Sequence, residues 1–389
     1  MLTFEKFSGI NNVQPEHRLG DTDLAVALDV DIGLSGELSR RSGFTAVSDL
    51  CHKNLHQAQG YMLATVNGDL TAIHPDGARS VVAQSLGVER VWYADLPGGR
   101  TTFSNGLIHG ITDGLTGQDW SVPVPAGVGM LSVMAGALHP GKYAYYLTHV
   151  RQSDGLEGAP VMAPPTQISA GGVFLMGLPV LGGHRTNVYL SGHDGEGAYL
   201  AGSTATDAFM FGGPNNLLTL PCRTLGLSPA PVGTVSAFWR GRVLVAQGST
   251  LWASMPHAPH LFDMRRDFKQ FPSRITLVHP VDGGIYVGTD DDLIFLGGET
   301  FDQLTYTEKQ LGPVVLGSGV SVPGDKIKLG DGRASGDAMV CIAGGYLVAG
   351  LGSGQAYPLT SERYKTSATE VSATFRVIDG IPQYIAVPQ

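Results

Sequence analysis

The sequence predicts an all-β protein: a β-propeller of about six blades with an immunoglobulin-like β-sandwich inserted into it. A strand–turn–strand phrase recurs along the chain, glycine is abundant, and helical periodicity is almost absent. Of the 389 residues, 54 are glycine, about twice the usual ~7% share. Because proline or glycine interrupts most windows long enough for a helix, strands and tight turns are the expected elements.

The recurring phrase places a turn dipeptide between two β-rich runs. The dipeptides are Asn67–Gly68, Asn105–Gly106, Arg240–Gly241, Asp282–Gly283, Gly344–Gly345 and Asp379–Gly380. Three of the intervals between them are 38, 42 and 35 residues, close to the ~40–50 residues of a four-stranded propeller blade. A fourth interval of 62 residues predicts a blade with a long loop over 313–336.

One interval is much longer and predicts a second module. From Asn105 to Arg240 is 135 residues, and the excess over one blade is close to the ~100 residues of an immunoglobulin-like sandwich. Strand-like runs occur at 142–150, 172–178, 187–191 and 197–201. With proline-rich boundaries at 121–126 and 228–232, the expected division is blades over 51–120, an insert over 121–222, and further blades over 223–389.

An arm over residues 1–50 precedes the first blade. Residues 24–33 alternate as a strand, and 35–44 read as a turn and a second strand. We expect these early strands to close the propeller by pairing with the last blade, over 375–387.

Charge limits the function classes. The net charge is −9, charged residues make up 15% of the chain against the usual ~25%, and no run of five like charges occurs. A nucleic-acid-gripping protein would carry a basic stripe, although an acidic wall could border a sliding polyanion. Low charge is consistent with a surface buried by neighbouring subunits or with a large monomer rich in Ser and Thr.

Cysteine usage and hydropathy predict synthesis in a reducing cytoplasm. Cys51, Cys222 and Cys341 lie far apart, without the spacing of a disulfide framework or zinc knuckle. The first residues contain no apolar signal region. The longest apolar stretch, 126–138, has 13 residues, short of the ~20 that span a bilayer, so no membrane insertion is expected.

Several side-chain groups could carry chemistry, but each has a structural alternative. Cys51, His52 and His56 could bind a metal or lie in a polar loop. His257 and His260 are separated by proline-containing sequence that prevents a helix, which favours a loop. Asp290, Asp291 and Asp292 alternate faces, which favours a hairpin turn over a calcium loop.

Enzyme motifs are weak. Residues 112–120 vaguely resemble the Asp-box turn of sialidase-type propellers, which is a folding turn and not a catalytic element. No nucleophile elbow, phosphate-binding loop or dinucleotide fingerprint occurs. The four tryptophans favour core packing over a carbohydrate-stacking row. We therefore expect no catalytic residue, cofactor or metal.

Three segments resemble a known family. The leading segments 8–12, 28–33 and 37–44 resemble the start of virion proteins of short-tailed bacteriophages, with Asp29 where that pattern has asparagine. The stretch 143–160 resembles their fibronectin type III-like insert, and 354–364 resembles their last blade. These relatives are tail nozzle, or tail hub, proteins.

The resemblance implies a structural virion protein made in the bacterial host cytoplasm. Copies would form a homo-oligomeric ring, a hexamer, below the portal and head–tail adaptor, with fibre, spike or plug proteins attached. Phage DNA would pass through without specific binding, and Asp290, Asp291 and Asp292 are our choice for channel-facing residues. Two other hypotheses remain: a receptor- or carbohydrate-binding, glycan-cleaving propeller, and a cellular propeller scaffold.

Overall fold

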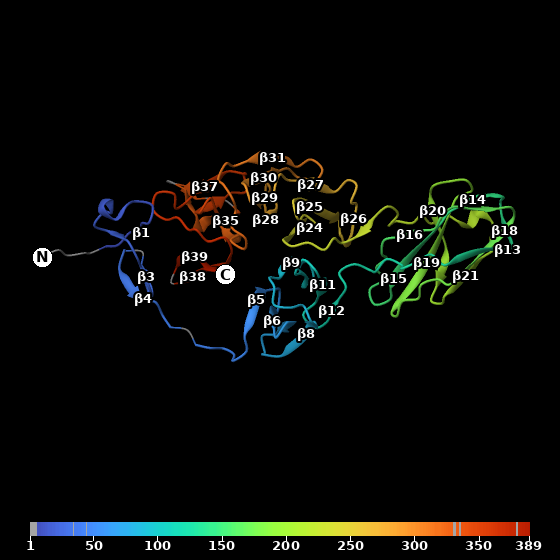
Figure 1. The fold of residues 1–389 in the computed structure, drawn as a ribbon, viewed down its shortest axis with the longest axis horizontal. Coiled ribbons are helices and arrows are strands. Elements are labelled where there is room, and N and C mark those ends of the chain that lie inside the picture. The colour runs from blue at the N-terminus through green and yellow to red at the C-terminus, as the bar shows by residue number, and fades with distance from the viewer. Residues whose placement is uncertain (1–5, 34, 44, 330–331, 334–335, 379) are drawn as a thin grey trace.

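The computed structural model describes residues 6–389 except 34, 44, 330–331, 334–335 and 379. In this part of the chain the regular elements are strands and three short 3-10 turns. Small antiparallel sheets surround a common axis, and a separate sandwich lies at one side (Figure 1). The predicted all-β propeller with an inserted sandwich is therefore confirmed. No helix in the described ranges is long and apolar enough to cross a bilayer.

Five blades have four main strands each, joined mostly as up-and-down antiparallel meanders. Blade 1 comprises β5 (His52–Gln57), β6 (Met62–Val66), β7 (Asp69–Ile73) and β8 (Arg79–Ala83), and blade 2 comprises β9 (Trp92–Leu96), β10 (Arg100–Ser104), β11 (His109–Thr112) and β12 (Gly117–Gln118). Blade 3 comprises β23 (Ser236–Trp239), β24 (Arg242–Gln247), β25 (Thr250–Met255) and β27 (Phe268–Gln270), extended by β22 (Ser228–Pro229) and β26 (Ala258–Phe262).

Blade 4 comprises β28 (Ile275–Val281), β29 (Gly284–Thr289), β30 (Leu293–Gly297) and β31 (Thr305–Glu308). Blade 5 comprises β32 (Val320–Pro323), β35 (Asp337–Ala343), β36 (Tyr346–Gly350) and β37 (Ala356–Pro358), with a 3-10 turn over Gly324–Lys326 and the small hairpin β33 (Lys328–Leu329) and β34 (Gly332–Arg333) in its long loop. Blade 6 has only two strands, β38 (Val371–Ile378) and β39 (Ile381–Pro388).

Three of the repeated dipeptides, Asn67–Gly68, Arg240–Gly241 and Gly344–Gly345, form turns with positive φ at both residues, whereas neither Asp282 nor Gly283 has a positive φ. Asn67 and Gly68 have φ of 53° and 88°, and Arg240 and Gly241 have 45° and 80°. Two consecutive positive φ angles define a turn whose twist matches that of the flanking strands. These turns join β6 to β7 and β23 to β24, which explains why they mark the blades in the sequence.

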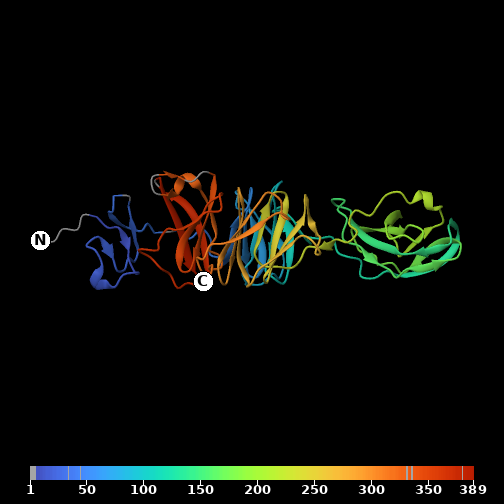
Figure 2. The ribbon, with the colours of Figure 1, turned by 90° about the horizontal axis from the view of Figure 1, so that it is seen from above.

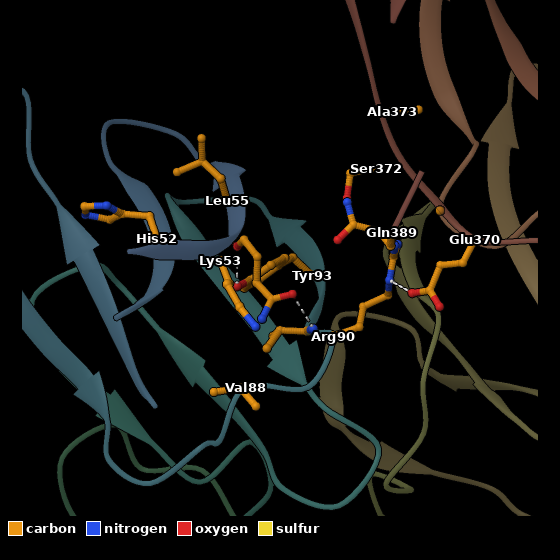
Figure 3. A pocket seen from close by; sticks show the side chains of 13 residues that line it. His52, Lys53, Leu55, Val88, Arg90, Tyr93, Glu370, Ser372, Ala373 and Gln389 are labelled. Carbon is orange, nitrogen blue, oxygen red and sulfur yellow. Dashed lines mark hydrogen bonds and ion pairs between the residues drawn. The ribbon is translucent and has the colours of Figure 1, made fainter. Parts of the chain in front are cut away.

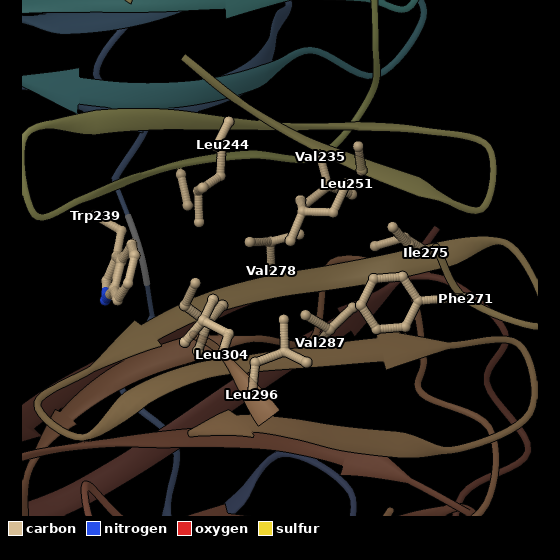
Figure 4. Close-up of a cluster of buried hydrophobic side chains, with 14 of the residues drawn as sticks. Val235, Trp239, Leu244, Leu251, Phe271, Ile275, Val278, Val287, Leu296 and Leu304 are labelled. Carbon is tan, nitrogen blue, oxygen red and sulfur yellow. The ribbon is translucent and has the colours of Figure 1, made fainter. Parts of the chain in front are cut away.

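Apolar clusters fill five of the junctions between neighbouring blades. The largest lies between blades 3 and 4, where Leu244 and Leu251 from one blade meet Val287 and Leu296 from the next (Figure 4). Corresponding clusters join blades 1 and 2, 2 and 3, 4 and 5, and 5 and 6. Burial of these faces stabilises each junction by roughly 25 cal/mol per Å² of apolar area removed from water.

The sandwich comprises β13 (Met130–Leu138), β14 (Gly141–Tyr143), β15 (Tyr145–Arg151), β16 (Val161–Met162), β17 (Thr166–Ile168), β18 (Gly171–Met176), β19 (His184–Ser191), β20 (Ala198–Thr204) and β21 (Ala208–Phe211), followed by a 3-10 turn over Asn215–Leu217. Two main sheets, β13-β18-β21 and β16-β15-β19-β20, enclose an apolar core of its own. Both views show the sandwich projecting beyond the propeller (Figures 1 and 2).

The junction between sandwich and propeller is built from hydrogen bonds. The indole of Trp120 donates to the carbonyl of Pro259 at 2.9 Å, and the Ser121 hydroxyl donates to the carbonyl of His260 at 2.8 Å. The same hydroxyl accepts the amide of Ala230 at 2.7 Å. The chain therefore enters and leaves the insert at adjacent points on blade 3.

The arm comprises β1 (Gly9–Ile10), a 3-10 turn over Glu16–Arg18, β2 (Asp23–Leu24), β3 (Val30–Ile32) and β4 (Leu38–Arg40). The expected closure of the propeller by the arm is not what the described residues form. β3 pairs with β4, and β38 pairs with β39. The arm is instead held at its root, where Arg363 pairs with Asp23 at 3.2 Å and Asn12 bonds to the backbone of Lys365.

Candidate interaction site at the ring seam

The junction between blade 6 and blade 1, called the seam below, differs from the other five. Among the described residues no apolar cluster fills it. A cleft of about 490 Å³ lies there, lined on one side by β5 and the loop before β9, and on the other by β38 and the residue after β39 (Figure 3). The propeller is therefore closed at the seam by individual polar contacts.

Arg90 makes the principal contact across the seam. Its Nε lies 2.7 Å from Oε1 of Glu370, and a terminal guanidinium nitrogen donates to the carbonyl of Val371 at 2.7 Å (Figure 3). The arginine side chain is only 19% exposed and the glutamate 41%. A partly shielded charge-assisted pair of this kind stabilises more than a fully exposed one.

Gly317 makes room for this contact. Its φ is +76°, and a Cβ at this position would lie 2.1 Å from both an Arg90 nitrogen and the Val371 carbonyl oxygen. Only glycine combines that backbone conformation with so close an approach.

Asn54 fixes the other wall of the cleft. Its side chain donates to the Glu89 carbonyl at 2.7 Å and accepts the Val91 amide at 3.1 Å, so it holds both neighbours of Arg90. Its own φ is +53°, a conformation that asparagine tolerates better than most residues. The Tyr93 hydroxyl donates to the Asn54 carbonyl at 2.9 Å, and burial raises the pKa of Tyr93.

A hydrogen bond between a histidine and a carboxylate lies beside this wall. His56 stacks on Tyr93 with ring centroids 4.7 Å apart, and its Nε2 lies 3.1 Å from Oδ1 of Asp95. Burial raises the pKa of Asp95, but hydrogen bonds from His56 and Thr101 and the attraction of His56 outweigh it, so the net shift is downward. This keeps the carboxylate ionised and the ring of His56 fixed.

The chemistry of the seam is that of a contact surface. Among the described lining residues, Glu370 is the one carboxylate, and Arg90 engages it. Lys53 and Leu55 are exposed at the rim, and Leu55 is 62% exposed. Polar side chains together with exposed apolar side chains such as Leu55 make the cleft suitable for docking of a polypeptide segment.

The histidine and cysteine groups suggested by the sequence are dispersed. Cys51 is exposed, His52 bonds to the carbonyl of Leu50, and His56 bonds to Asp95. His257 lies in a turn with φ of +57°, whereas His260 is buried and lies 3.2 Å from the Glu157 carbonyl. In the described ranges no three His, Cys, Asp or Glu residues are grouped as metal ligands.

The acidic residues chosen as channel-facing lie in the turn between β29 and β30. Asp290 pairs with Arg274 at 3.0 Å, while the Asp292 carboxylate accepts the amide of Leu311 at 2.7 Å. The side chains of two of these three residues thus have contacts within the propeller, and the placement of the three toward a channel between copies stays a prediction. The tryptophans lie in or against the inter-blade clusters, with Trp120 2% exposed.

Of the residues that line the seam, the sequence singled out only His52, as a metal candidate, and it did not indicate the contact that closes the seam. Arg90 and Glu370 are 280 positions apart, and neither stands in a motif. Gly317 lies in the glycine-rich stretch that the sequence assigns to a loop, but glycine alone does not indicate which side chain approaches it.

Comparisons with known proteins find only distant likenesses. No family model matches the chain, and no curated protein matches it. Among solved structures, the BBS1N domain in complex with ARL6DN has 10% identity and a TM-score of 0.34, covering 87% of this chain and 88% of its own. The N-terminal domain of Nup159 has 10% identity and a TM-score of 0.30, covering 86% and 72%.

The Trypanosoma rangeli sialidase has 10% identity and a TM-score of 0.26, covering 92% of this chain and 55% of its own. Likenesses at this level carry no inference about function. The function has to be argued from the chain itself.

Proposed function

We propose that this chain is a structural virion protein, the subunit of the tail nozzle or hub of a short-tailed bacteriophage. The observation that carries the proposal is a propeller interrupted by one guest sandwich, in the part of the chain where the sequence resembles the fibronectin type III-like insert of that family. A charged fraction of 15% adds support, because the centres of subunit interfaces are depleted of charge.

In this role copies of the chain form a closed homo-oligomeric ring, a hexamer, with heterologous contacts between neighbours. One end of the ring meets the portal or head–tail adaptor, and the other carries fibre, spike or plug proteins. The sandwich projects from each propeller (Figure 2) and offers a second surface for such partners. The particle's DNA passes through the ring during ejection.

Electron microscopy of the purified full-length chain, alone and mixed with the adaptor protein of the same phage, tests the proposal. Closed rings are the expected result. A protein that stays monomeric at high concentration with adaptor present contradicts it. A glycan array and a hydrolase screen run on the same sample separate the receptor- or carbohydrate-binding alternative, which requires binding or cleavage that a nozzle subunit does not.

DNA passage makes a second demand on the assembled ring. With a net charge of −9, the subunit should bind duplex DNA weakly, because phosphate affinity depends on Lys and Arg contacts that release counterions. Fluorescence anisotropy with a duplex probe should show little binding at physiological salt. Tight, strongly salt-dependent binding would contradict free passage.

A further inference from the structure

Among the described residues, blade 6 has two strands fewer than its neighbours, and no strand pairs with the outer edge of β39. Ile378 and Ile381 are the pair nearest the turn between β38 and β39, and they form a hydrogen-bonded pair. Along the hairpin, hydrogen-bonded and non-hydrogen-bonded pairs then alternate, so every second residue of β39 directs its backbone N–H and C=O groups away from β38. Pro382 and Pro388 fall at outward-facing positions, where a missing N–H does not weaken the hairpin. Within the described residues, Tyr384 and Ala386 keep backbone groups that face no neighbouring strand.

A groove lies on each side of blade 6, but only one of the two is lined by residues of β39. The seam cleft lies on the blade 1 side, and a second groove of about 330 Å³ lies on the blade 5 side, where Leu347, Tyr364, Tyr384 and Ala386 contribute to its lining. A strand added beside β39 would direct alternate side chains to the two faces. Its side chains on one face would therefore enter the groove lined by Tyr384 and Ala386, and those on the other face would point toward blade 1.

The arm contains a strand-like segment that is paired only at its two ends. Leu24 pairs with Ile10, and Val30–Ile32 pairs with β4, while Asp29 between them has φ of +55° and would have to become extended in a continuous strand. Leu24, Val26, Leu28, Val30 and Ile32 alternate with small or acidic residues. Yet residues 25–29 belong to no ladder, and Val26 and Leu28 are 69% and 81% exposed. The hairpin of β3 and β4 continues this segment, so the arm carries the two strands that blade 6 lacks.

The two faces of the segment match the two grooves. Its apolar face suits the apolar blade 5 side. Its other face carries Asp29 and Asp31 toward the blade 1 side, where the exposed Lys53 lines the seam cleft and Arg90 already neutralises Glu370. Asp31 is paired with Arg41 in the structure, but that pair is exposed and is worth little.

We infer that the arm segment Leu24–Ile32 of a second copy pairs with the free edge of β39, and that β4 then becomes the fourth strand of blade 6. One chain holds both the donor segment and the acceptor edge, and its own arm is fastened at Asp23 to Arg363 without reaching β39. Donor and acceptor at different places on one chain give head-to-tail contacts that close into a ring. This inference rests on the proposed function, because the closed ring supplies the head-to-tail arrangement in which each arm reaches the next copy.

Cross-linking of mixed chains tests the pairing directly. In a background with the exposed Cys51 replaced by serine, one tagged chain carries Leu28→Cys and an untagged chain carries Ala386→Cys. Because each has one accessible cysteine, a mixed disulfide forms only between copies. We expect at least tenfold more mixed product than with Leu107→Cys as the untagged partner, a residue of blade 2 that is also 81% exposed.

A chain carrying both Leu28→Cys and Ala386→Cys distinguishes the two sources of the strand. Pairing between copies gives linear and circular oligomers on a non-reducing gel. A product that is only internally linked monomer overturns the inference, because it shows that the arm completes its own blade. Absence of product in both experiments overturns it as well.

Assembly variants complete the test. Leu28→Lys and Ala386→Pro should reduce the fraction of rings at least tenfold while leaving the monomer folded, whereas Leu107→Lys should assemble normally. If wild-type rings form and these variants assemble equally well without mixed cross-links, the inference fails and the nozzle proposal stands. If wild type forms no rings with adaptor, the nozzle proposal fails, and the mixed cross-link alone decides the pairing.

Discussion

Three consecutive aspartates in the turn between β29 and β30 have three different environments. Asp292 is half-buried and its carboxylate accepts the amides of Gln310, Leu311 and Gly312 at 2.7–3.1 Å. Asp290 forms a bidentate contact with Arg274, and within the described residues the Asp291 carboxylate accepts no hydrogen bond. Although the three residues are identical in the sequence, only Asp292 holds the backbone of the 310–312 turn.

Asp292→Ala should destabilise the protein by about 2 kcal/mol, because three backbone amides lose a charged acceptor. Asp291→Ala should change the free energy of unfolding by less than about 0.5 kcal/mol, as exposed substitutions usually do. Urea denaturation of both variants checks this. Equal effects would show that the 310–312 turn does not depend on the Asp292 carboxylate.

Gly317 gives a prediction about the seam at the same scale. Gly317→Ala should cost about 1–3 kcal/mol more than Gly77→Ala, because both glycines have positive φ but only the first has neighbours that a Cβ would strike. Gly77 has φ of +85° and nothing within 4 Å of the added atom. Denaturant midpoints of the two variants measure the difference, and similar midpoints would mean that Arg90 moves aside without cost.

At the scale of elements, β15 and β19 bring two histidines together in the sandwich, one buried and one half-buried. His149 is 3% exposed, and its ring lies 6.0 Å from that of His184. Its Nδ1 shares a hydrogen bond with the Thr186 hydroxyl at 3.2 Å. Burial lowers the pKa of His149, and repulsion from His184 lowers it further.

The lowered pKa of His149 should make the protein less stable in acid. The folded form binds fewer protons than the unfolded chain from the ordinary histidine pKa of about 6.5 down to the lowered value, so stability falls as the pH drops through that window. Thermal unfolding followed by circular dichroism at about pH 7.5 and 5 measures the loss. His149→Gln should reduce the loss, whereas exposed His17→Gln should not alter it.

At the scale of the whole molecule, the sandwich and the propeller are two bodies with separate cores. Replacing residues 123–227 with a short Gly-Ser linker should leave the propeller folded, because Ser121 and Ala230 already lie within hydrogen-bond distance of each other. The remaining chain should unfold cooperatively, with a thermal midpoint within about 5 °C of wild type. Loss of cooperative unfolding would show that blade 3 needs the insert.

The sequence predicted what depends on local signals and missed what depends on distant contacts. Turn pairs such as Asn67–Gly68 encode their positive φ locally, so blades and the insert could be placed by counting between them. Closure of the propeller depends on Arg90 meeting Glu370 across 280 positions, which no local pattern records. The sequence correctly predicted a strand over 30–32, but it also predicted a strand over 25–29, which belong to no strand in the structure. An alternating pattern shows that a segment can form a strand, but it does not show whether a neighbouring strand is there to pair with it.

The adjacent entry and exit of the insert have a practical consequence. Since both ends of the guest leave blade 3 within one hydrogen bond of each other, a different module of similar end-to-end spacing could be exchanged there by protein engineering. A fluorescent or gold-binding protein grafted at 123–227 would mark the position of each copy of the chain in an electron or light micrograph.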